Sequence, residues 1–313
     1  MKPISVNSIF TKDVIIIILV IVLIATLIIN GYAYKKTMEV NKVGYLSLFL
    51  SEDYVNNLEV EELLKAKLKE DYSGDVYTDI QNYVAMNLIE DIKTLENPRD
   101  SEYIKYYSKE EFTRLFEFAN TQELLSSYKS LNESIFYVNL QFYKKGVTYN
   151  EFESNINDIN KHDQLIIDLR DSPGGDVSEM EKVLECFVNK GDRLYSIKSN
   201  LNTEHIISNT EPKVKVENII ILSNEKTASS SEILMTSIKE NLENVTIIGQ
   251  TSYGKGFVTN IYSFKDGTGV SLINAYWLTP NGININLEGV MPDIVIEDTV
   301  DALDEAVKEL EQY

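Results

Sequence analysis

Apolar residues run without interruption near the start of the chain, from Val14 to Ile29, and the span continues through Asn30 and Gly31 to Tyr34. A helix over Val14–Tyr34 covers about 30 Å, which is the thickness of the hydrocarbon core of a bilayer. We therefore predict a single transmembrane anchor there, preceded by a short N-terminal segment over residues 1–13. The alternative is a cleaved signal peptide, for which Gly31-Tyr32-Ala33 is an acceptable cleavage site. Lysines flank the apolar segment on both sides and leave its orientation open.

The next part of the chain has the apolar spacing of helices. In LEVEELLKAKLKED and VYTDIQNYVAMNLIEDIKTLE, apolar residues recur three and four positions apart. Asn97-Pro98 interrupts this pattern, and SKEEFTRLFEF resumes it. Residues 35–130 are thus predicted as a helical N-terminal region, whose charged residues indicate a solvated face rather than a binding surface.

From residue 131 the pattern changes to short apolar runs that alternate with amphipathic helices. Strands are predicted at Ile135–Tyr143, Leu165–Leu169, Ile219–Leu222, Val245–Ile248 and Ile294–Ile296. A hairpin is predicted from Val258–Phe264 and Val270–Leu278. Helices are predicted at Tyr149–Ile159, over the segment that carries Met180 to Phe187, from Ser231, and at Asp301–Glu311. Residues 131–313 are therefore expected to form an α/β core with mixed strands.

Composition narrows the classes of partner. The chain has 313 residues with 43% hydrophobic content, enough for a sizeable core, and a net charge of -20. That charge argues against a nucleic-acid partner, because phosphate binding needs a basic patch. Cys186 is the only cysteine, which excludes an intrachain disulfide and a cysteine-based zinc site. We expect no nucleic acid, no metal and no cofactor.

Three consecutive serines lie where the strand Ile219–Leu222 passes into a helix. Unpaired N–H groups at such a turn, reinforced by the helix dipole, can receive the oxyanion of an acyl-transfer intermediate. Ser229, Ser230 and Ser231 are therefore candidate nucleophiles, and the residue pattern does not choose among them. The pattern Ser229-x-x-Glu232 also fits a capping box, which is the structural alternative.

A lysine follows the next predicted strand. Lys255 lies between Gly254 and Gly256, where the backbone can approach another segment closely. A lysine acts as a general base only when burial lowers its pKa from about 10.4 toward neutrality. His162 and His205 stand in no recognisable motif, which favours a serine and lysine pair over a histidine triad. The alternative is a solvated surface lysine.

A glycine turn, Arg170 to Asp176, follows the predicted strand Leu165–Leu169. Successive glycines let N–H groups converge on an anion, so Gly174 and Gly175 can complete an oxyanion hole with the N–H that follows the serine. An ordinary tight turn is the alternative. A phosphate loop is disfavoured, because its lysine and spacing are missing.

Five segments in this order carry a resemblance: LIIDLRDSPGG, ILSNEKTASSSEI, IIGQTSYGKGFV, LTPNG and GVMPDI. Together they resemble the signature blocks of the C-terminal processing, or tail-specific, serine peptidase family, over roughly residues 130–297. The resemblance implies a ClpP/crotonase-like α/β core with a Ser/Lys dyad. It also implies cleavage of unstructured or C-terminal segments of exported proteins through an acyl-enzyme.

Carried over position by position, the resemblance places the nucleophile at Ser229 and the general base at Lys255. The N–H of Ser230 and that of Gly174 or Gly175 become the oxyanion donors. Family members with such an anchor hold the catalytic domain outside the cytoplasm. The resemblance thus implies a single-pass membrane protein with residues 1–13 in the cytoplasm and polypeptides as substrates.

Two departures from the family pattern qualify this expectation. Thr259 stands where the family usually has a glutamine that supports the lysine, and a hydroxyl reaches less far than an amide. The alternative function is therefore an impaired peptidase that binds peptides without cleaving them. Many members also carry a PDZ domain before the core, and the stretch between Phe118 and Ile135 is too short for one. We expect a PDZ-less member that holds its peptide by the core or the helical region.

Overall fold

The computed structural model describes residues 89–312, except 91, 95, 122–125, 200, 265–266 and 298–299. The predicted anchor Val14–Tyr34 lies outside the described residues, as does most of the predicted helical region. Among the helices of the described part, none is both long enough and apolar enough to span a bilayer. The chain divides into two compact units, Met1–Glu110 with Ile261–Leu272, and Glu111–Asn260 with Ile273–Tyr313.

The described residues of the first unit include helix α5 (Pro98–Ser101) and strand β1 (Lys105–Tyr107). The side chain of Asn97 caps α5 by accepting the N–H of Asp100 at 2.9 Å. Strand β1 pairs antiparallel with Gly269–Ser271 at the start of strand β10. The prediction of helix alone is wrong here, because a strand partner far along the chain leaves no mark on local spacing.

The second unit is built on a sheet in the order β11-β8-β7-β4-β3-β2. Its neighbouring strands are parallel except for the antiparallel pair of β2 and β3. Strand β4 is buried at every position, as expected of a parallel strand covered on both faces. The predicted strands that correspond to β4, β7 and β8 are confirmed within one residue at each end. The strand bounds are β2 Ser127–Ser130, β3 Ile135–Asn139, β4 Gln164–Asp168, β7 Asn218–Ser223, β8 Val245–Gly249 and β11 Ile294–Val295.

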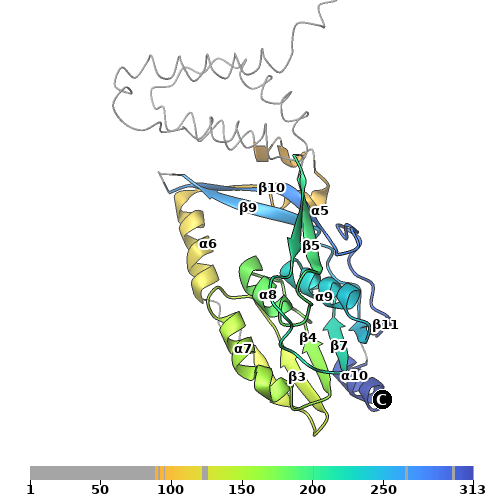
Figure 1. The fold of residues 1–313 in the computed structure, drawn as a ribbon. Helices are drawn as coiled ribbons and strands as arrows, with labels where there is room; N and C mark the ends of the chain where they lie inside the picture. Colours follow the sequence, from red (N-terminus) through yellow and green to blue (C-terminus); the bar gives the residue numbers. More distant parts are fainter. Residues whose placement is uncertain are drawn as a thin grey trace, which may run out of the picture. The chain divides into compact units, whose positions relative to one another are not determined.

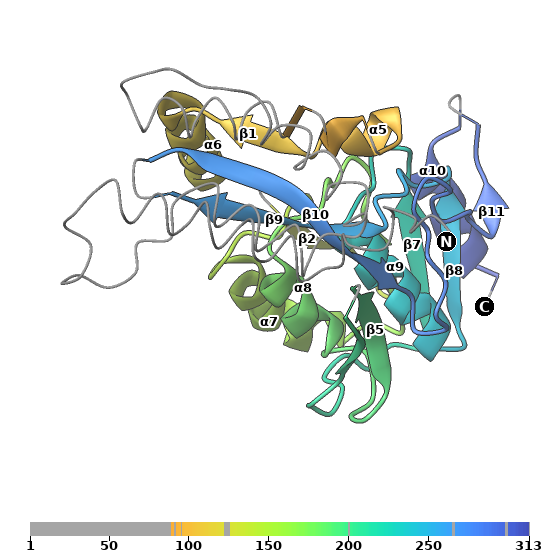
Figure 2. The ribbon, with the colours of Figure 1, turned by 90° about the horizontal axis from the view of Figure 1, so that it is seen from above.

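Helices cover both faces of this sheet. One face packs against α7 (Thr148–Ile159), α8 (Val177–Leu184) and α9 (Ser230–Asn241). The other face packs against α10 (Ala302–Leu310), which lies beside β7 and β8 in Figures 1 and 2. Because side chains alternate along a strand, Ile167 of β4 faces the first layer and Ile166 faces α10. The predicted mixed α/β core is confirmed.

A second group of strands completes the architecture. Strands β5 (Arg193–Lys198) and β6 (Thr203–Ile207) pair antiparallel, and residues Tyr276–Leu278 of β10 (Gly269–Leu278) pair with β5. Strand β9 (Phe257–Ser263) pairs with β10, so the predicted hairpin is confirmed. The β5–β6 hairpin is an addition that the apolar spacing did not indicate.

Three predicted boundaries need correction. Strand β3 ends at Asn139 rather than Tyr143, because Tyr143 exchanges hydrogen bonds with the glycine turn: its N–H donates to Gly174 O at 3.1 Å. Helix α8 ends at Leu184, so Phe187 is buried in the turn beyond it. Strand β2 occupies the end of the region predicted as helical, because it pairs with β3. Helix α6 (Lys109–Thr121) agrees with the predicted helix.

Candidate active site

The turn between β7 and α9 is tied to the turn that follows β4. Thr227 is fully buried, and its hydroxyl donates to Leu169 O at 2.8 Å. The N–H of Ala228 donates to Ser172 O at 2.9 Å. Both turns leave the carboxyl ends of neighbouring parallel strands, which is why the serine run and the glycine turn meet.

Ser229 has a strained backbone. Its φ of 57° and ψ of -123° place a non-glycine residue outside the usual regions, directly before the first residue of α9. Such strain persists only where surrounding contacts hold it, and it concentrates at functional sites. The residue is partly exposed at this sharp turn. Its hydroxyl is therefore presented at the start of a helix.

The hydroxyls of the next two serines are engaged in the interior. Ser230 is fully buried and donates to Gly175 O at 3.0 Å. Ser231 is also fully buried, with its Oγ 2.8 Å from Ser172 Oγ. The three serines that sequence spacing could not separate thus lie in three different surroundings, and only Ser229 among them is partly exposed.

The glycine turn (Arg170 to Asp176) lies against the turn between β7 and α9 that carries Ser229, which we call the serine turn. A Cβ on Gly174 would come within 2.8 Å of Ala228 O, 2.9 Å of Ser230 N and 3.0 Å of Ser229 Cβ. Gly175 is equally close to the backbone of Tyr143, where a Cβ would lie 2.5 Å from the carbonyl oxygen. Both glycines have positive φ angles, 95° and 144°. The structure therefore brings the two predicted oxyanion donors of this turn next to the N-terminus of α9.

Glu232 connects the serine turn to the turn that carries Gly254, Lys255 and Gly256, which we call the lysine turn. Its side chain is completely buried in the first turn of α9. Oε2 accepts the backbone N–H of Ser229 at 2.8 Å and that of Lys255 at 2.9 Å. Oε1 accepts the hydroxyl of Ser252 and the N–H of Gly254, each at 2.6 Å. One carboxylate thus fixes two segments that are more than twenty residues apart.

Sequence reasoning recognised only the local half of this arrangement. The capping-box geometry is present, with the Ser229 N–H bound to Glu232. The N–H of Glu232 makes its 2.8 Å hydrogen bond to the carbonyl oxygen of Ser229. The bonds to Ser252, Gly254 and Lys255 come from the tertiary fold, and no local signal announces them. Burial raises the pKa of the Glu232 carboxyl, and the hydrogen bonds that it accepts oppose this effect.

Lys255 is held in a crowded turn. The segment from Asn284 to Gly289 crosses its flanking glycines so closely that a Cβ on Gly256 would lie 2.5 Å from Asn286 N. The carbonyl oxygen of Lys255 accepts the indole N–H of Trp277 at 2.7 Å. Its Nζ lies 5.6 Å from the centroid of the Phe257 ring. Burial lowers the pKa of the Lys255 amine, and the charge of Glu232 acts in the opposite direction.

Thr259 lies on β9, two residues beyond Phe257. Its hydroxyl oxygen is buried and has no hydrogen-bond partner within the part of the chain that the structure describes. Neither a buried hydroxyl nor its lack of a partner was predicted.

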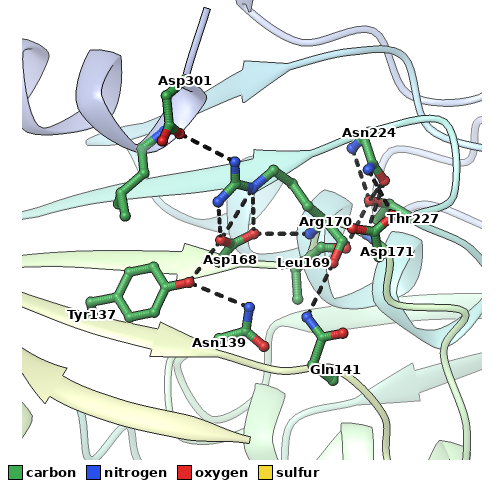
Figure 3. A network of polar contacts seen from close by, with 11 residues as sticks. Tyr137, Asn139, Gln141, Asp168, Leu169, Arg170, Asp171, Asn224, Thr227 and Asp301 are labelled. Atoms are coloured by element: carbon green, nitrogen blue, oxygen red, sulfur yellow. Dashed lines mark hydrogen bonds and ion pairs between the residues drawn. The ribbon is translucent and has the colours of Figure 1, made fainter. Parts of the chain in front are cut away.

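A polar network that sequence reasoning missed joins the end of β4 to Arg170 and Asp171, the first residues of the glycine turn (Figure 3). Asp168 at the end of β4 is buried and accepts the Tyr137 hydroxyl at 2.8 Å and Arg170 Nη2 at 2.6 Å. Asn224 Oδ1 accepts the N–H of Asp171 at 3.0 Å, which joins the turns after β4 and β7. A carboxylate that ends a buried strand, followed two residues later by an arginine, is the signal that indicates such a network.

No metal cluster accompanies these groups in the described part of the chain: no three His, Cys, Asp or Glu side chains there are placed to hold an ion.

Comparison with known families and proteins agrees with the motifs. Residues 134–296 match the model of Peptidase family S41. A protein of Staphylococcus epidermidis described as "Probable CtpA-like serine protease" is 30% identical over 184 residues. A protein of the same description from Staphylococcus aureus is 29% identical over 185 residues. Each alignment covers 54% of this chain and 37% of the relative, so the chain matches little more than a third of their length.

A solved structure described as a lipoprotein from Streptococcus agalactiae has a similar fold. Its TM-score is 0.64 at 19% sequence identity, and the alignment covers 89% of this chain and 99% of that chain. At this identity the likeness concerns the fold alone.

Proposed function

Because the chain belongs to peptidase family S41, we propose that it is a serine-type peptidase with Ser229 as nucleophile and Lys255 as general base. The observation that carries the proposal is the buried carboxylate of Glu232, which accepts the backbone N–H of both residues. A nucleophile and a base that share one rigid support keep their relative position. The partial exposure of Ser229 and the lowered pKa of Lys255 support the same assignment.

In the proposed reaction, the neutral amine of Lys255 takes the hydroxyl proton of Ser229 while Oγ bonds to the carbonyl carbon of the peptide. The N–H of Ser230 and that of Gly174 or Gly175 receive the negative charge on the carbonyl oxygen. The C–N bond then breaks, and the ammonium of Lys255 gives its proton to the leaving amine. Water hydrolyses the acyl-enzyme with the same lysine as base. Thr259 is the proposed support of the lysine.

The proposed substrates are unstructured or C-terminal segments of exported polypeptides. This part of the proposal rests on the motif blocks and on the CtpA-like description of the relatives. The proposed layout has residues 1–13 in the cytoplasm, a single-pass anchor at 14–34, a helical region at 35–130 and a ClpP/crotonase-like core at 131–313. The core lies outside the cytoplasm in this layout, and no PDZ domain precedes it.

The test of the catalytic proposal is cleavage of an unfolded protein by the full chain. Wild type is expected to degrade it, and Ser229→Ala is expected to lose activity by about 10⁶-fold, as nucleophile removal does in a measured hydrolase. Ser154→Ala, which removes an exposed hydroxyl on α7, serves as the matched control. Equal degradation by wild type and Ser229→Ala contradicts the proposal. Saturable peptide binding by wild type without turnover supports the non-cleaving alternative instead.

Cell fractionation tests the anchor. The full chain is expected in the membrane fraction, and a variant without residues 1–34 is expected in the soluble fraction. External protease added to intact cells should digest the core if it lies outside. A mature N-terminus directly after Ala33 identifies a cleaved signal peptide and contradicts the anchor.

A further inference from the structure

An open cavity of about 470 Å³ lies in the second unit, between helix α7 and strand β2. Its lining residues are Ser126 and Tyr128 at the start of β2, and Asn150, Glu151, Ser154 and Asn155 on α7. Residues four apart on a helix share a face, so the four α7 residues form one polar strip. None of the six residues takes part in the proposed reaction.

The polar strip offers more hydrogen-bond acceptors than donors. Asn150 Nδ2 donates to Gly146 O at 3.0 Å, and Asn155 Nδ2 donates to Glu151 O at 2.8 Å. The hydroxyl of Ser154 donates to Asn150 O at 2.7 Å. These donors are therefore directed back into the helix, whereas the side-chain amide oxygens of Asn150 and Asn155 accept no hydrogen bond from the described residues. An occupant of the cavity must bring donors of its own.

Glu151 adds a negative charge to these acceptors. Its side chain is half-buried, and within the part of the chain that the structure describes its carboxylate forms no ion pair or hydrogen bond. Glu153 on the same helix differs, because it accepts Lys213 Nζ at 2.7 Å and the Tyr149 hydroxyl at 2.6 Å. An unpaired carboxylate among amide oxygens suits a cation with several N–H bonds, which is a guanidinium or an ammonium group.

The strand beside the cavity has a backbone edge that a peptide can use. Among the described strands, β2 is the last of its sheet and pairs with β3 alone. The N–H of Leu131 donates to Ile135 O at 2.9 Å, so this pair is hydrogen-bonded, and the next such pair is Lys129 with Tyr137. The backbone N–H and C=O of Tyr128 therefore point away from β3. An extended polypeptide can pair with such an edge.

We infer that the cavity and the edge of β2 form an exosite for the polypeptide substrate, in which an extended segment pairs with β2 and places an arginine or lysine side chain against Glu151. This inference rests on the proposed function. A polypeptide is the occupant that brings both an extended backbone and cationic side chains. The net charge of -20 favours basic segments in the same direction. The exosite also gives the core a means of holding a peptide without a PDZ domain.

The test is the binding of a fluorescent peptide to full-length Ser229→Ala, measured by anisotropy, because this variant is expected to bind without cleaving. The probe is an unstructured peptide with a blocked N-terminus and one arginine as its only cation. A second probe carries citrulline instead, which keeps the shape of the side chain and removes its charge. The arginine probe is expected to bind about tenfold more tightly than the citrulline probe. Adding Glu151→Gln should abolish this difference.

Glu153→Gln is the matched control. It removes the same charge two residues further along α7, from a carboxylate that Lys213 already pairs. The preference for arginine should persist in this variant. Both glutamine variants change partly or fully exposed side chains and should keep the wild-type Tm.

A small cation tests the part played by the strand edge. N-acetylarginine amide has the guanidinium without an extended backbone, so it should displace the arginine probe only at concentrations about a hundredfold or more above those of the unlabelled peptide. Displacement at equal concentrations would contradict pairing with β2.

The outcomes distinguish the exosite from the function on which it rests. Equal binding of the two probes, or equal effects of Glu151→Gln and Glu153→Gln, overturns the exosite and leaves cleavage by wild type untouched. Where wild type cleaves, Glu151→Gln should raise KM for an arginine-containing substrate about tenfold at unchanged kcat. If wild type does not cleave and Ser229→Ala still prefers arginine, the proposed peptidase activity is wrong and the peptide-binding site stands.

Discussion

Ser229 and Lys255 donate their backbone N–H groups to the same oxygen atom, Glu232 Oε2, at 2.8 and 2.9 Å. The other oxygen of that carboxylate binds Ser252 and Gly254. All four partners are donors, and Glu232 itself is completely buried. The relative position of the two proposed reacting residues therefore depends on one buried acceptor. Water cannot take its place, because the carboxylate is completely buried.

Glu232→Gln is expected to disrupt both turns. The amide would place an N–H₂ group against two N–H or O–H donors, which removes two hydrogen bonds and leaves buried donors unpaired. We expect a loss of about 3 kcal/mol or more in the free energy of unfolding. We also expect a large loss in the rate at which a fluorophosphonate, a reagent that reacts with nucleophilic serines, labels Ser229. Urea denaturation and labelling measure the two effects.

Glu240→Gln is the matched control on the same helix. Glu240 accepts the N–H of Asn281 at 2.7 Å in exposed surroundings. Its replacement should cost less than about 1 kcal/mol and leave labelling unchanged. Equal effects of the two glutamine variants would show that Glu232 has no special role.

Lys255→Met is expected to stabilise the protein at neutral pH. Burial holds the pKa of Lys255 below its ordinary value of 10.5. The folded state therefore binds fewer protons than the unfolded state between the lowered pKa and 10.5, and wild-type stability rises with pH across that window. Below the window the cost of burying the ammonium is fully present. The advantage of Lys255→Met should be largest at neutral pH and should narrow toward pH 10.5.

Urea denaturation at a series of pH values measures this advantage. A difference between wild type and Lys255→Met that stays constant up to pH 10.5 would contradict the burial of the amine.

Gly174→Ala and Gly191→Ala form a matched pair. Both glycines have a φ of 95°, so alanine is strained by about 1–2 kcal/mol at either position. A Cβ on Gly191 would meet nothing within 4 Å, whereas one on Gly174 would lie 2.8 Å from Ala228 O. Gly174→Ala should therefore cost about 2 kcal/mol more than Gly191→Ala, because the crowded backbone must shift. It should also suppress labelling, while Gly191→Ala should not. Similar Tm values and similar labelling for the two variants would refute the contact with the serine turn.

Leu287→Gly is expected to stabilise the lysine turn. Leu287 has a φ of 69°, and its side chain is 52% exposed, so little packing compensates for the strain. Its N–H donates to Gly254 O at 3.0 Å, a bond that glycine retains. We expect a gain of about 1 kcal/mol in the free energy of unfolding, reduced by the entropy that glycine adds to the unfolded chain. A loss of more than about 1 kcal/mol would mean that the leucine side chain makes contacts of its own.

The alternation of apolar runs and amphipathic helices predicted the fold well where strands are buried on both faces. Strands β4 and β7 read as continuous apolar runs because helices cover both sides of their sheet. The short strands β1 and β2 were missed because their partners, not their own residues, make them strands. The β5–β6 hairpin was missed because its outer strand is exposed and carries little apolar signal.

The candidate site was predictable in its parts and not in its connections. Motifs located the serine run, the glycine turn and Lys255, and the structure brings Gly174 against Ser229. Spacing could not distinguish Ser229 from its two neighbours, because the difference lies in which hydroxyls are buried and bonded. Glu232 read as a helix cap because its local contact is that of a cap, while its three other bonds reach residues brought near only by folding.

The double attachment of Glu232 has a consequence for how this protein can decay over evolution. A single codon change at this position is expected to loosen the turns of Ser229 and Lys255 together, and so to remove the proposed activity in one step. A gene copy released from selection can then keep both the serine and the lysine and still encode a dead peptidase. Loss of the glutamate is therefore expected to mark an inactive copy as clearly as loss of the serine or the lysine.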